Sequence, residues 1–440
     1  MSKSPKKIAI LGGGIAGLSA AFHLTNQPDW QKHYEITLYQ MGWRLGGKAA
    51  SGLNTDIADR IEEHGIHLFG NMYVNSLSLV NDCLKEVKWE KDEPRAFFNN
   101  MENVFLRSNH QIVTEYPIEG ETAWKQLPMK LPHTGGIPWT DDFRITRKRL
   151  AIWHQDMVRR LTGALLKMLK TPEVFNFIND DAKDKIHPLL FTSTNCRNKD
   201  GSINKAKVLD GQMKEYLGKL YGLFHGSQTE IPKKASQDLR IWLRDIDAVG
   251  RRIEAGLIEL GVKPIPPKKM SYARRCQYFG KLLDEIDAFF ESNGLGHVFE
   301  WTYVKTDFYN TLIKGVFKDN LFKRGLDSLD DEQLNYTDWM AKHGLNQRTQ
   351  KSALMRVITN VCFAYSGGDT EQLPKMSATC FLMFLLRQMF AHGHAIHFFQ
   401  GGTGGTIITP IYRVLKQRGV KFEFFHKVLD IEPDKANKRI

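Results

Sequence analysis

The sequence predicts an α/β fold in which a parallel sheet, built from both ends of the chain, is interrupted by a large helix-rich insertion. The first observation is a buried-type strand at 7–11 that leads directly into a glycine-rich turn. A helix at 18–24 and a second strand at 34–39 follow this turn, which is the order expected of a βαβ unit. The second observation is the largely helical periodicity between about 140 and 390.

The third observation is the return of strand-like segments near the end of the chain. Residues 395–399 precede a glycine-rich stretch, and a helix at 407–418 is expected to end at Gly419. Further strands are expected at 420–425 and 428–431.

These segments divide the chain into two predicted domains. Residues 1–96 and 395–440 are expected to form one discontinuous dinucleotide-binding domain. Residues 97–394 form the intervening domain, with short strands and loops up to about 137 and helices beyond.

The glycine-rich turn carries the first chemical signal. Gly12, Gly14 and Gly17 form the pattern G-x-G-x-x-G between a strand and a helix. Gly12 permits the tight turn, Gly14 lets the backbone approach a pyrophosphate, and Gly17 allows close packing of helix and strand. The helix N-terminus, including Ile15 and Ala16, offers N–H groups and partial positive charge to the phosphates. The sequence therefore predicts dinucleotide binding, in the manner of a Rossmann-like fold.

The end of the second strand departs from the usual pattern. Dinucleotide-binding proteins normally have Asp or Glu there to bind the ribose hydroxyls, whereas this chain has Gln40. A Gln side chain can also accept a hydrogen bond from a hydroxyl, although without the charge of a carboxylate. Gln40 is therefore the predicted ribose ligand.

A second glycine motif follows Gln40. Arg44, Gly46, Gly47 and Lys48 form R-x-G-G-K, which resembles the second glycine motif of the flavin amine oxidase and phytoene desaturase superfamily. The resemblance implies a GR2-type FAD-binding fold with a large substrate domain inserted. It also implies that these four residues contact the pyrophosphate and ribityl chain of FAD.

The segment after this motif strengthens the resemblance. From Glu63 the sequence is similar to the E-x-G-x-H-x-F-x-G segment of phytoene and zeta-carotene desaturases, although Gly70 follows Phe69 directly. In those enzymes the segment lies beside the flavin. The resemblance therefore implies that Gly65 contacts FAD and that His67 is the candidate catalytic residue. An ordinary core histidine is the alternative for His67.

The end of the chain resembles the return of the superfamily to its FAD domain. There, a strand of the type V-x-x-I contacts the adenine, and Val428 begins the matching segment here. Superfamily members also close the FAD site with a further C-terminal segment, which we expect to be absent from this sequence after Ile431. The site would then be completed by a second chain, or the chain is a fragment.

Composition and charge limit the remaining alternatives. The 440 residues are 42% hydrophobic and include five scattered cysteines, which predicts a globular protein of a reducing compartment without a disulfide framework. No third ligand accompanies His64 and His67, so no metal site is expected. The net charge is +12, but no nucleic-acid-binding module is recognisable.

Location is predicted from the same features. The sequence shows neither a signal peptide nor a transmembrane helix, so we expect a cytoplasmic protein. A basic amphipathic helix at 144–170 suggests contact with a membrane surface, and a helix packed on the core is the alternative.

The function implied by the resemblance is that of an FAD-dependent, desaturase-like oxidoreductase. Its substrate would be a hydrophobic small molecule, such as a polyene or lipid, that transfers a hydride to the flavin. The alternatives are a flavin amine or amino-acid oxidase, and a truncated or split subunit that is inactive alone.

Overall fold

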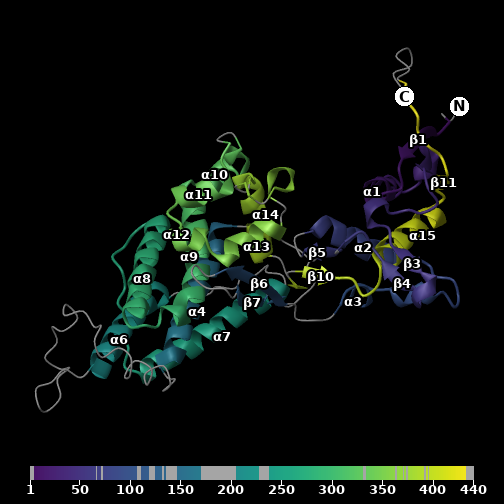
Figure 1. The fold of residues 1–440 in the computed structure, drawn as a ribbon. Helices are drawn as coiled ribbons and strands as arrows, with labels where there is room; N and C mark the ends of the chain where they lie inside the picture. The colour runs from purple at the N-terminus through teal and green to yellow at the C-terminus, as the bar shows by residue number, and fades with distance from the viewer. Residues whose placement is uncertain are drawn as a thin grey trace, which may run out of the picture. The chain divides into compact units, whose positions relative to one another are not determined.

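The structure is a computed structural model of the chain (Figure 1). It describes residues 4–65, 67–70, 73–106, 111–117, 124–130, 133–134, 146–169, 205–226, 237–330, 333–361, 364–369, 371–372, 375–390, 393–394 and 396–432.

The chain separates into two compact units. The first contains 1–111, 130–141 and 391–440, and the second contains 112–129 and 142–390. The assignment of cofactor binding to the first unit and substrate binding to the second stays a prediction.

The first unit contains most of the strands. Its strands are β1 (Lys6–Leu11), β2 (Tyr34–Gln40), β3 (Gly52–Asn54), β4 (Arg60–Glu62), β5 (Leu68–Gly70), β8 (His133–Thr134), β9 (Gly393–His394), β10 (Ile396–Phe398) and β11 (Lys421–Phe424). Its helices are α1 (Ile15–Leu24), α2 (Val74–Glu86), α3 (Met101–Val104) and α15 (Thr409–Arg418), with short 3-10 turns between them.

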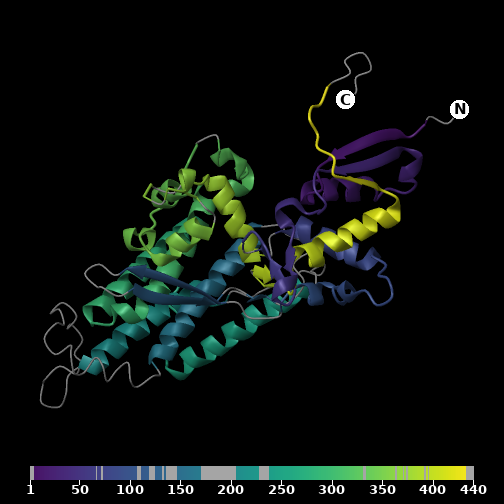
Figure 2. The ribbon, with the colours of Figure 1, turned by 45° about the vertical axis from the view of Figure 1, so that its right-hand side comes forward.

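A parallel sheet in the order β1-β2-β11 forms the centre of this unit. Figure 2 shows the yellow C-terminal strand beside the purple N-terminal strands. Ile8 pairs with Ile36, and Phe422 of β11 pairs with Leu38. Ile36 and Leu38 are buried because alternate side chains of β2 point to the same face of the sheet. Strands from opposite ends of the sequence thus share one sheet, as the sequence predicts.

Helices α1 and α15 pack together within this unit and extend its core. Leu18 and Phe22 of α1 and Val414 of α15 are fully or almost fully buried. Helix α15 follows a single π-turn at Gly404–Ile408 and ends at Gly419, whose φ of +96° is a conformation that favours glycine.

Smaller two-stranded sheets complete the first unit. Strands β3 and β4 are antiparallel, β5 pairs with β10, and β8 pairs with β9. The pairing of β5 with β10 brings the segment containing His67 beside the chain that returns from the second unit.

The second unit is mainly helical. Its elements are β6 (Gln111–Pro117), β7 (Trp124–Lys130), α4 (Arg147–Leu169), α6 (Lys205–Phe224), α7 (Gln237–Glu259), α8 (Tyr272–Ser292), α9 (Gly296–Lys318), α10 (Leu321–Arg324), α11 (Tyr336–Lys342), α12 (Gln347–Gln350), α13 (Ala353–Val361) and α14 (Ala378–Phe390).

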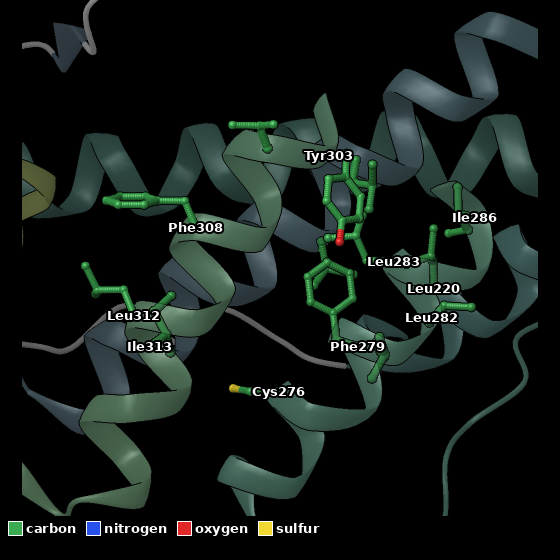
Figure 3. Close-up of a cluster of buried hydrophobic side chains, with 14 of the residues drawn as sticks. Leu220, Cys276, Phe279, Leu282, Leu283, Ile286, Tyr303, Phe308, Leu312 and Ile313 are labelled. Carbon is green, nitrogen blue, oxygen red and sulfur yellow. The ribbon is translucent and has the colours of Figure 1, made fainter. Parts of the chain in front are cut away.

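The core of the second unit is centred on α8 and α9, which pack along their lengths. Phe279, Leu283 and Ile286 recur at helical spacing on α8 and are fully buried. Figure 3 shows them grouped with Tyr303 and Leu312 of α9.

Helix α4, which forms most of the basic amphipathic segment, belongs to the core of the second unit. It packs against α6, α7 and α9, and Leu150, Leu161 and Leu165 lie in the core. Even Arg159 is only 4% exposed. These contacts favour the core interpretation, and contact with a membrane surface stays a prediction. Among the described helices, none has both the length and the apolar character needed to cross a bilayer.

Candidate dinucleotide site

The glycine turn after β1 has the geometry that its pattern predicts. Gly12 has a φ of +100°, which favours glycine, and its N–H donates to the Tyr39 carbonyl at 2.8 Å. A Cβ on Gly17 would lie 2.2 Å from the Gly12 carbonyl oxygen, so only glycine lets α1 approach the turn this closely. A Cβ on Gly14 would meet no atom within 4 Å. The space over Gly14 is therefore open to a ligand.

The N-terminus of α1 is open to a ligand as well. Gly14 is the N-cap residue and supplies no side-chain hydrogen bond to the first turn. Ile15 and Ala16 begin the helix and are exposed. The N–H groups of a first helical turn have no acceptor within their own helix. These groups suit an anion such as a phosphate, because the helix dipole adds partial positive charge.

Gln40 ends β2, and its side chain is hydrogen-bonded to both glycine motifs. Its Oε1 accepts a hydrogen bond from the Gly13 N–H at 2.8 Å, and its Nε2 donates to the Arg44 carbonyl at 3.1 Å. The amide group thus ties the first glycine turn to the second. Contact of Gln40 with a ribose stays a prediction, and the side chain would have to share its amide between the ligand and these two loops.

The second glycine motif lies directly against the first. The Gly46 N–H donates to the Gly13 carbonyl at 2.7 Å, and Gly46 forms a parallel bridge with Gly14. A Cβ on Gly47 would lie 3.3 Å from the Gly14 Cα. The structure therefore brings the two glycine motifs together, and the positive φ of Gly46 and Gly47 favours glycine at both positions. The adjacent Lys48 is exposed.

A cleft of about 840 Å³ lies beside this junction. Arg44 and Ser51 form one part of its wall, and the glycine-rich loop before α15 forms another. The Arg44 guanidinium donates to the Ser51 carbonyl at 3.1 Å and lies over the Trp43 ring. Arg95, Arg413 and Lys416 also line the cleft, and the charges of Arg95 and Arg413 are paired with Glu93.

The segment between β4 and β5 contains a polar cluster that includes His67. Nδ1 of His67 lies 2.8 Å from Oε2 of Glu63. Oε1 of Glu63 accepts from the Ser51 hydroxyl at 2.6 Å and from the Thr403 N–H at 2.7 Å. Burial raises the pKa of Glu63, but the hydrogen bonds from Ser51 and Thr403 outweigh it and hold the pKa below its ordinary value. Glu63 is therefore a carboxylate at neutral pH.

The cluster adds three residues to the site that the sequence predicts. Ser51, Glu63 and Thr403 are not among the predicted site residues, although Glu63 begins the motif that contains His67. Thr403 lies in the middle of the glycine-rich run 401–405, and this run is the sequence feature that could have indicated a site there. Gly65 is exposed, a Cβ on it would meet no atom within 4 Å, and its contact with a cofactor stays a prediction.

The prediction of a strand at 428–431 is wrong. The ladder between β11 and β2 ends where Phe424 pairs with Gln40, the last residue of β2. The His426 N–H still donates to the Gln40 carbonyl, but β2 offers no further partner beyond it. Val428 lies outside any strand and is 44% exposed, and its contact with an adenine stays a prediction. Among the described residues, no group of His, Cys, Asp and Glu is arranged to hold a metal ion.

Comparison with known proteins agrees with this geometry. Residues 10–83 match the NAD(P)-binding Rossmann-like domain family, and the match extends from β1 through most of α2. The N-terminal part of the chain therefore has the fold of a Rossmann-like domain. The predicted Rossmann-like α/β fold is thereby confirmed.

A curated relative matches part of the chain. Carotenoid phi-ring synthase of Chlorobaculum tepidum is 34% identical to this chain over 73 residues. The aligned stretch covers 16% of this chain and 10% of the relative. Both matches are thus limited to a small part of the chain.

Proposed function

We propose that this chain is an FAD-dependent, desaturase-like oxidoreductase that acts on a hydrophobic substrate. The observation that carries the proposal is the contact between the two glycine motifs. It joins an open helix N-terminus, with Gly14 as its cap, to the chain that bears Arg44. A simple nicotinamide site has no need of the second motif, so this contact favours FAD over a nicotinamide dinucleotide.

The residues present fit an FAD molecule. The first-turn N–H groups of α1, at Ile15 and Ala16, would hold the pyrophosphate, and Gly14 would let it approach the backbone. Arg44 would add positive charge, which suits phosphate recognition. When bound, a flavin supplies a two-electron acceptor for a hydride.

His67 is the proposed proton acceptor of the reaction. Formation of a carbon–carbon double bond releases a proton in addition to the hydride. Nδ1 of His67 contacts Glu63, so Nε2 is the nitrogen that would take this proton. The name of the curated relative supports a carotenoid-like polyene as the substrate class, although that similarity lies within a short stretch of the chain.

The first experiment is the visible absorption spectrum of the purified chain, followed by mass identification of any released cofactor. Bound FAD, or a flavin spectrum that develops on adding FAD, is the expected result. Titration with NAD⁺ and NADP⁺ in parallel separates the two cofactor classes. A chain that takes up a nicotinamide dinucleotide, or that stays colourless after adding FAD, would refute the assignment of FAD.

A substrate test follows from the same sample. Apolar polyenes in detergent are added to the flavin-loaded chain without oxygen, and bleaching of the flavin absorption reports hydride transfer. Primary amines and amino acids serve as the comparison set. Bleaching by amines alone would favour an amine oxidase over the desaturase-like function.

A further inference from the structure

The polar cluster around Glu63 fixes which atoms face each other. Oε1 accepts the Ser51 hydroxyl and the Thr403 N–H, and the Thr403 hydroxyl also lies 2.8 Å from it. Oε2 faces Nδ1 of His67 at 2.8 Å. The two carboxylate oxygens therefore have separate tasks, one toward the loop 401–405 and one toward the imidazole.

The neighbouring contacts keep the carboxylate in this orientation. The Ser51 hydroxyl accepts a hydrogen bond from the Gly404 N–H at 2.8 Å, so its own hydrogen is free to point at Glu63. The Thr403 hydroxyl lies 2.8 Å from the Ala49 carbonyl, 2.8 Å from Oε1 of Glu63 and 3.1 Å from Nδ1 of His67, and it can donate to only one of them. The Thr403 N–H has no such choice, since a backbone amide can only donate.

These contacts determine the tautomer of His67. A carboxylate only accepts hydrogen bonds, so a neutral imidazole facing Oε2 must carry its proton on Nδ1. The other nitrogen, Nε2, then has a free lone pair. We propose that Glu63 is a positioning residue that holds the proton of His67 on Nδ1 and leaves Nε2 available as a base. The role of His67 as a base rests on the proposed function. The assignment of its tautomer does not depend on that function.

The variant Glu63→Gln makes a sharp prediction. The amide oxygen must take the position of Oε1, because Ser51 and the Thr403 N–H both donate there. The amide NH₂ then takes the position of Oε2 and donates to Nδ1 of His67. The imidazole must accept at Nδ1 and carry its proton on Nε2, so the substitution inverts the tautomer and removes the base.

The test is NMR of the full chain labelled with ¹⁵N-histidine, recorded at alkaline pH, well above the ordinary pKa of histidine. The His67 resonance is identified by its loss in His67→Asn. The expected result is Nδ1–H in the wild type and in Glu63→Asp, and Nε2–H in Glu63→Gln. Glu62→Gln is the matched control, because its side chain is 47% exposed and pairs with Arg60, and it should leave the tautomer unchanged.

Two outcomes would overturn the proposal. One is an Nε2–H tautomer in the wild type, which needs only the His67→Asn chain for the assignment. The other is the same tautomer in Glu63→Gln as in the wild type. Since the measurement uses no cofactor, it is independent of FAD binding. A chain that shows the expected tautomers but binds no flavin would refute the proposed function and leave the role of Glu63 toward His67 intact.

Discussion

Substitution of Gly17 by Ala tests the close packing of α1 on the glycine turn. The added Cβ would lie 2.2 Å from the carbonyl oxygen of Gly12 and 3.2 Å from Cγ2 of Ile10. An approach below 3.0 Å is not tolerated by real Cβ atoms. Because the contacted oxygen belongs to the backbone, it cannot rotate away, and the helix must move from the turn.

Two opposing effects decide how far Gly17→Ala changes the free energy of unfolding. Replacing Gly with Ala inside a helix stabilises a protein by about 0.4–1 kcal/mol when the conformation permits it. Overpacking costs about 1–3 kcal/mol. The overlap with a fixed carbonyl is severe, so we expect Gly17→Ala to lower the free energy of unfolding by about 2 kcal/mol. At roughly 2–4 °C per kcal/mol for a unit of this size, Tm falls by about 4–8 °C.

The matched control is Gly14→Ala. Its Cβ meets nothing within 4 Å and its φ is −73°, so Tm should change little. The methyl group would instead fill the space proposed for the pyrophosphate, and the Kd for FAD should rise about 10- to 100-fold. Differential scanning calorimetry and flavin titration of the full chain give both values. A Gly17→Ala chain as stable as the wild type would refute the packing argument, and unchanged FAD affinity in Gly14→Ala would refute the proposed approach of the phosphate.

Two further predictions concern stability. Burial lowers the pKa of His154 from 6.5 to about 4, so the unfolded chain takes up a proton first as pH falls, and the free energy of unfolding should drop by about 3 kcal/mol between pH 6.5 and about 4. Urea titrations of the wild type and His154→Gln across this range check it, and an equal pH dependence in both would exclude His154 as the source. Arg418 joins α15 to α1 and α2 by donating to Glu86 at 2.7 Å and to the Phe22 carbonyl at 3.0 Å. Arg418→Met should therefore cost about 2 kcal/mol by thermal unfolding, and the exposed control Lys416→Met should cost almost nothing.

Much of the fold follows from local sequence patterns. The strand, glycine turn and helix at the N-terminus are predictable because each depends on neighbouring residues and on the backbone freedom of Gly12. The long helices are predictable because residues such as Phe279, Leu283 and Ile286 recur at helical spacing. The strand expected at 428–431 fails because a strand also needs a partner, and that partner ends at Gln40.

The candidate site was predictable only in part. The glycines are visible because their spacing in the sequence reports one local turn. The task of Gln40 was not visible, since it depends on two loops that meet in space. The role of Thr403 was not predictable either, because Thr403 and Glu63 are far apart in the sequence and meet only in the folded chain.

The sequence by itself determined the Rossmann-like fold and the turn that suits a dinucleotide, because close-range backbone geometry depends on glycines at fixed spacing. Only the tertiary structure decided how the second glycine motif meets the first, and which atoms of Glu63 face Thr403 and His67. The physical reason is that hydrogen bonds are short and directional. They are set by the positions of atoms that the folded chain brings together, and sequence spacing carries no record of those positions.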